Sequence, residues 1–123
     1  MTSLVNKFHI LKLLINSILI SITLFQFSCG EKPEINISKT IMFEGQLYEM
    51  DKEEPFSGLV YNTYPDGQRE YEGQYKNGKP NGLLVYWYKN GNKMREGKLQ
   101  DGFPVGRWIL YHEDGTVQET MDH

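Results

Sequence analysis

The stretch EGQYKNGKPNGLLVYWYKNG at residues 72–91 is followed, 24 positions further on, by EGKLQDGFPVGRWILYHEDG at residues 96–115. All four glycines of the first stretch recur in the second, and so does its proline. Asp or Asn stands directly before the glycines at 67, 78, 91, 102 and 115. Because glycine adopts positive φ without a Cβ clash and Asn and Asp tolerate the left-handed region, these pairs predict two-residue hairpin turns.

The intervals between these turn glycines alternate between 11 and 13 residues, so successive turns are expected at opposite ends of a set of strands. Runs rich in Tyr, Trp, Val and Leu fill the intervals, which is typical of β-strands. We expect strands at 41–49, 59–64, 69–75, 83–88, 93–99, 107–112 and 116–120. The sequence therefore predicts an all-β protein, an elongated antiparallel β-meander of 24-residue hairpin repeats, with no helix after residue 29.

Gly73 and Gly97 stand at the same point of two charged strands rather than in turns. A glycine inside a strand marks a bulge or a close approach of another group. We expect an aromatic ring from a neighbouring strand to lie over each glycine, and Trp87 and Trp108 are the candidates.

The first 28 residues have the layout of a secretory signal helix, with Lys7 and Lys12 before an apolar run at 13–27. That run is shorter than the roughly 20 residues that span a hydrocarbon core. The small Ser28 followed by Cys29, the only cysteine, resembles the lipobox of bacterial lipoproteins, in which the cysteine is lipidated. An uncleaved single-pass anchor and plain secretion remain alternatives.

Polar residues around Pro33 predict that residues 29–40 are the lipidated cysteine and a flexible linker, with the β-hairpin repeat domain at 41–123. The whole chain carries 13 basic and 16 acidic residues. Loss of residues 1–28 removes two lysines and leaves a net charge of -5. Such a chain has no basic excess for phosphates, so nucleic acid is not an expected partner.

The sequence has few residues of the types that form catalytic sites. His112 is the one histidine expected to be ordered, and Ser38 and Ser57 lie outside any GxSxG pattern. Glu70 with Glu72 is best explained by a solvated strand edge, and no calcium-loop or phosphate-loop spacing occurs. We therefore expect no enzyme, no cofactor and no metal site.

Aromatic side chains are the remaining candidates for function, because Tyr and Trp provide large contact area at low entropic cost. The candidate partner-binding residues are Tyr64, Tyr86, Trp87, Tyr88 and Trp108. The alternative is that these rings pack mainly against one another along the sheet.

The stretches at 58–67, 72–91 and 96–115 resemble MORN-type repeats, and more closely the variant in bacterial YwqK-family antitoxins. The resemblance implies an elongated sheet of successive hairpins that serves as an interaction surface without fixed active residues. The expected function is an exported, lipid-anchored, non-catalytic protein-binding or structural module of the bacterial cell envelope, periplasmic or surface-exposed. An antitoxin or immunity-like protein that neutralises a partner by surface contact is one alternative, and a glycan-binding module is another.

Overall fold

The computed structural model describes residues 30–123, so the predicted signal helix at 1–28 and the lipidation of Cys29 fall outside the described residues. Lys32–His123 form one compact unit. The strands are β1 (Glu34–Asn36), β2 (Thr40–Phe43), β3 (Gln46–Glu49), β4 (Gly58–Thr63), β5 (Arg69–Lys76), β6 (Lys79–Trp87), β7 (Lys93–Gln100), β8 (Phe103–Tyr111) and β9 (Val117–Asp122). Within this unit the only helical element is the single 3-10 turn η1 (Ile37–Lys39).

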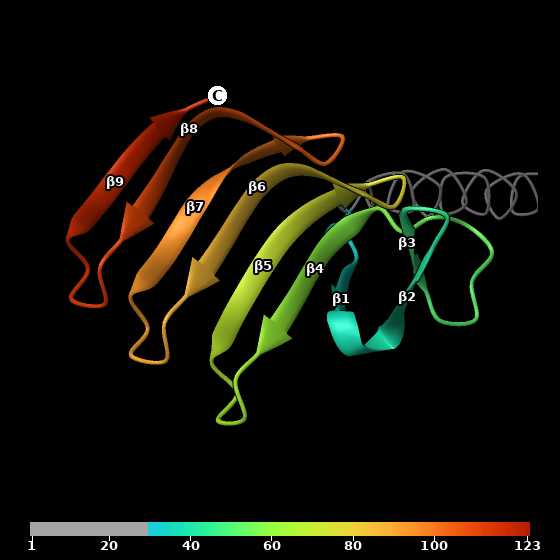
Figure 1. Cartoon of the computed structure of the whole chain (residues 1–123). Helices are drawn as coiled ribbons and strands as arrows, with labels where there is room; N and C mark the ends of the chain where they lie inside the picture. Colours follow the sequence, from blue (N-terminus) through green and yellow to red (C-terminus); the bar gives the residue numbers. More distant parts are fainter. Residues whose placement is uncertain (1–29) are drawn as a thin grey trace, which may run out of the picture. The chain divides into compact units, whose positions relative to one another are not determined.

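The all-β prediction is confirmed. Seven strands form one sheet in the order β1-β4-β5-β6-β7-β8-β9, and β2 and β3 form a separate two-stranded sheet (Figure 1). From β4 to β9 each strand pairs antiparallel with the next along the chain, which makes the predicted meander. Only β1 pairs in parallel, along β4.

The predicted linker is wrong for residues 34–40. Glu34–Asn36 form β1, and the amide of Leu59 donates a hydrogen bond of 2.8 Å to the carbonyl of Pro33. The side chain of Ile35 is only 6% exposed and belongs to the same core cluster as Val60. An apolar residue among polar ones thus orders this segment, because burying its side chain removes apolar surface from water.

The predicted strand at 41–49 is also wrong in part, since it is the β2–β3 hairpin. Its turn lies at Glu44 and Gly45, whose φ angles are 48° and 76°. Two successive positive φ values define the two-residue hairpin turn. Glutamate is an uncommon residue in that position, which is why the pair was not predicted as a turn.

The predicted Asx-Gly turns fall into two types. Asn77–Gly78 and Asp101–Gly102 have positive φ at both residues, as predicted. At Gly67, Gly91 and Gly115 only the glycine has positive φ, so the two-residue prediction is wrong there. The amide of Gly67 donates to the carbonyl of Tyr64 at 2.9 Å, and the amide of Tyr64 to the carbonyl of Gln68 at 2.8 Å. These bonds close a three-residue loop.

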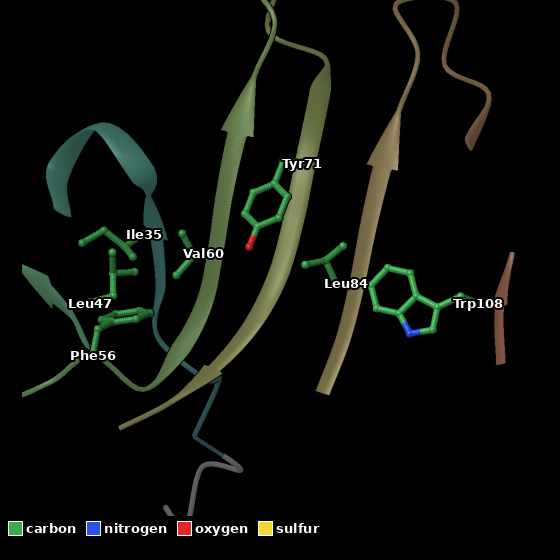
Figure 2. Close-up of a cluster of buried hydrophobic side chains, with 7 residues drawn as sticks. All are labelled: Ile35, Leu47, Phe56, Val60, Tyr71, Leu84 and Trp108. Atoms are coloured by element: carbon green, nitrogen blue, oxygen red, sulfur yellow. The ribbon is translucent and has the colours of Figure 1, made fainter. Parts of the chain in front are cut away.

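The core follows one face of the sheet (Figure 2). The buried members of this cluster are Ile35, Leu47, Phe56, Val60, Tyr71, Leu84 and Trp108. Gly73 on β5 pairs with Val60 on β4 and with Leu84 on β6. Gly97 on β7 pairs with the same Leu84. Both glycines therefore lie in a row whose other members carry large apolar side chains.

Trp108 covers Gly97 as predicted, because a Cβ built on that glycine would overlap the indole ring. Trp87, the other candidate, is not among the groups nearest to Gly73. A Cβ on Gly73 would instead overlap the phenol of Tyr71, which comes from the same strand. Figure 2 shows the Tyr71 ring lying between Val60 and Leu84.

Candidate functional site

Trp108 is one of the predicted partner-binding aromatic residues, and in the structure its side chain is buried. Its side chain is 8% exposed, and its Nε1 donates a hydrogen bond of 3.1 Å to the carbonyl of Lys98. A buried indole with its one donor satisfied is a core residue. Trp108 is therefore not a surface contact residue, contrary to the sequence prediction.

Tyr64 and Tyr88 connect neighbouring hairpins. The Tyr64 hydroxyl donates to the carbonyl of Trp87 at 2.7 Å, and the Tyr88 hydroxyl donates to the carbonyl of Tyr111 at 3.0 Å. Both phenols are half-buried. These contacts favour the alternative in which the rings support the sheet, and Trp87 takes part through its backbone.

Tyr86 is half-buried on the core face beside other phenols. Its ring centroid lies 4.9 Å from that of Tyr71, and the Arg95 guanidinium lies 4.1 Å from the Tyr86 centroid. The Tyr71 hydroxyl contacts that of Tyr75 at 3.2 Å, and burial with this contact raises the pKa of Tyr71. A shallow cavity of about 280 Å³ is lined by Ile37, Asn62, Glu70, Tyr71, Tyr75 and Tyr86. The cavity walls combine three phenol rings with the polar side chains of Asn62 and Glu70.

A second surface was not predicted. Ile41, Met42, Phe43 and Met50, here called the hairpin patch, are 50–60% exposed on or next to the β2–β3 hairpin. The sequence predicted a single strand at 41–49, which contains Ile41, Met42 and Phe43. Because the hairpin lies outside the seven-stranded sheet, only Leu47 of its apolar side chains is buried. Ile41 and Phe43 share one face of β2, and Met42 lies on the other face. Exposed apolar side chains gathered on one small element are typical of an interaction site.

The Asp and Asn side chains of the three-residue loops accept hydrogen bonds from backbone amides. Asp114 Oδ1 accepts hydrogen bonds from the Thr116 amide at 2.8 Å and from its hydroxyl at 2.6 Å, which lowers the pKa of Asp114. Asp66 and Asn90 accept the corresponding amide hydrogen bonds in their own loops.

Across residues 30–123 no cluster of three or more His, Cys, Asp or Glu side chains could hold a metal ion. No helix within that range is long and apolar enough to cross a membrane.

Glu96 of β7 contacts polar groups from two adjacent strands, β7 and β8. Its carboxylate accepts hydrogen bonds of 2.6 Å from Lys93 Nζ and 2.6 Å from the Tyr111 hydroxyl. The Lys93 contact, followed by the Tyr111 contact, lowers the pKa of Glu96 from its ordinary value of 4.5. The same carboxylate raises the pKa of Tyr111.

This arrangement predicts a pH-dependent contribution to stability. Because the pKa of Glu96 is lower in the folded chain than in the unfolded chain, its stabilisation is present above pH 4.5 and is lost as the pH falls through the folded pKa. We expect Glu96→Gln to lower the melting temperature at pH 7 and to have little effect near pH 2. Thermal melts across this range test the prediction, with Glu119→Gln on exposed β9 as the control. An equal loss at both pH values would contradict it.

The chain was compared with protein-family models, curated proteins and solved structures, and none of the three comparisons gave a match. The fold and its surfaces define a class, an all-β protein with an antiparallel meander sheet and an exposed apolar hairpin.

Proposed function

We propose that this protein is an exported, lipid-anchored, non-catalytic module of the bacterial cell envelope, periplasmic or surface-exposed, which binds a protein partner through the hairpin patch. The exposure of Ile41, Met42 and Phe43 carries this proposal. Three consecutive apolar side chains that are more than half exposed leave apolar surface in water, and contact with a partner removes it.

The proposed anchor is a lipid on Cys29. Residues 30–33 alone separate that cysteine from β1, which begins at Glu34. At about 3.3–3.6 Å per residue, five steps reach no further than about 18 Å. A lipidated Cys29 would therefore keep β1 close to the membrane surface, in place of the longer flexible linker expected from the sequence.

We also propose that the sheet consists of 24-residue MORN-like units. Equivalent contacts support this unit length, since Tyr64 and Tyr88 donate to carbonyls at corresponding positions. The amides of Gly78 and Gly102 likewise donate to the carbonyls of Phe56 and Pro80, both at 2.8 Å. Both pairs are offset by 24 residues.

Site-specific photo-crosslinking in cells tests the partner. A photoreactive residue at Met42 is expected to capture one discrete protein, and the doubly substituted Ile41→Ser, Phe43→Ser chain is expected to lose that product. Val117 on β9, which is 59% exposed, is the control position and should give no such product. Equal capture at both positions, or capture of lipid alone at Met42, would contradict the proposal.

Fractionation of the same cells tests the anchor separately. We expect Cys29→Ser to move the chain from the membrane fraction to the soluble envelope fraction and to abolish labelling by a fatty-acid analogue. Labelling that survives the substitution would exclude this anchor, whatever the crosslinking shows.

A further inference from the structure

The end of the sheet that carries the two-residue turns is hollowed. The β5–β6 and β7–β8 turns lie at this end, near the β2–β3 turn (Figure 1). Two adjacent open grooves of about 660 Å³ each share Lys76, Asn81 and Gly82 and are together called the combined groove. The first is otherwise lined mainly by polar side chains from β3, β6 and β7, and the second reaches Lys32, Ser57 and Tyr75.

The combined groove gathers positive charge in an acidic chain. Lys32, Lys76, Lys79 and Lys98 line it, and they are four of the eleven basic residues that follow Cys29. Within residues 30–123 the ion pairs involve only Arg69, Lys93 and Arg107 among the cations. The four lysines thus have no carboxylate partner in the described chain.

The two acids of the groove have partners of their own. Asp101 accepts a hydrogen bond of 3.2 Å from Asn81, and Glu72 lies 3.9 Å from Nε of Arg69. Neither one neutralises the lysines directly. Four ammonium groups around a concavity therefore favour a ligand that carries carboxylate or phosphate groups.

The uncharged lining indicates what else the ligand carries. Amide side chains of Gln46, Asn77, Gln100 and Gln74 line the groove, and an amide both donates and accepts hydrogen bonds as a sugar hydroxyl requires. The backbone of Gly58 and Leu59 borders the second groove beside Gln74. A concave groove accommodates an extended polymer, whereas a planar bilayer contacts protruding surfaces.

We propose that this groove binds an acidic saccharide, an oligosaccharide whose sugars carry carboxylate or phosphate substituents. The lysines pair with the anionic substituents, and the amides form hydrogen bonds with the sugar hydroxyls. This site is separate from the hairpin patch and does not depend on the lipid anchor.

Calorimetric titration of the full chain in a nonionic detergent tests the site. The probes are a short oligogalacturonate, a phosphate-substituted oligosaccharide and the uncharged methyl ester of the first. We expect binding of at least one anionic probe, weakened about tenfold or more in the doubly substituted Lys79→Gln, Lys98→Gln chain. The corresponding arginine substitutions should retain binding. Lys39→Gln with Lys89→Gln makes the same charge change outside the groove and should leave the affinity unchanged.

Three results would overturn the assignment. They are failure of both anionic probes to bind, equal affinity for the methyl ester, and equal loss in the Lys39, Lys89 control chain.

Flotation on vesicles tests whether the anionic ligand is a lipid headgroup instead of a saccharide. Phosphatidylcholine vesicles and equal mixtures with phosphatidylglycerol should recover the chain equally, and extra recovery that requires Lys79 and Lys98 would make the ligand a lipid headgroup. Lys79 and Lys98 are exposed, so circular dichroism melts should match those of the unaltered chain.

Discussion

Replacing Gly97 with alanine is expected to destabilise the folded chain by about 3 kcal/mol, although it adds a single methyl group. That methyl would occupy the space of the Trp108 indole, and the ring cannot move outward without breaking the hydrogen bond from its Nε1 to the Lys98 carbonyl. Urea denaturation followed by circular dichroism measures the loss. Lys98→Ala, at the next and exposed position, is the control and should change stability by no more than about 0.5 kcal/mol.

A double-mutant cycle separates this overlap from other effects of the substitution. Trp108→Leu alone should cost about 3 kcal/mol, since it removes a large buried side chain. In that background Gly97→Ala should cost less than about 1 kcal/mol, because leucine leaves room for the methyl group. An undiminished cost of Gly97→Ala beside Leu at 108 would show that the glycine is required for its backbone alone.

The meander itself could be predicted because its information is local. Each hairpin turn needs positive φ at a glycine, and the spacing of those glycines fixes which strands are consecutive neighbours. The approach of Trp108 to Gly97 was predictable for the same reason, since the two residues lie on adjacent strands of one hairpin. Tyr71 was missed because it reaches Gly73 along its own strand, and periodicity does not show how a side chain leans.

Features that depend on distant residues were not predicted. β1 has only three residues and pairs in parallel with β4. Because the β2–β3 hairpin separates the two strands in the sequence, no turn between them predicts the pairing. The difference between two-residue and three-residue loops was missed because the same Asx-Gly pair occurs in both.

Most of the candidate site was likewise beyond sequence reasoning. The apolar residues of β2 were predicted as part of one strand, and the separation of the β2–β3 hairpin from the main sheet leaves them exposed. The lysine groove combines side chains that are far apart in the sequence, from Lys32 to Lys98, and its concavity depends on how successive turns are placed. The predicted aromatic residues were conspicuous in the sequence, but two of them, Tyr64 and Tyr88, make hydrogen bonds between hairpins.

Removal of residues 116–123 is expected to have the other large effect, a loss of cooperative unfolding together with self-association. β9 pairs with β8 along its length, and the amide of His123 donates to the Gly106 carbonyl at 3.0 Å. Met121 of β9 stands 24 residues after Gly97, pairs with Trp108 and packs against the core cluster. β5 and β7 have glycine at the equivalent position, whereas Met121 adds an apolar side chain beside Trp108. Without β9, Trp108 loses this cover and β8 becomes an edge strand with unpaired backbone groups, which is a template for pairing with another chain.

Met121→Gly separates the two contributions of β9. This substitution removes the apolar contact but keeps the strand, so we expect a loss of about 2–3 kcal/mol with an unchanged association state. The truncated chain should instead scatter light increasingly with concentration in a nonionic detergent and lose its sharp thermal transition. If the truncated chain melted as sharply as the full chain and did not associate, β9 would be dispensable, and the core would end at the contact of Trp108 with Gly97.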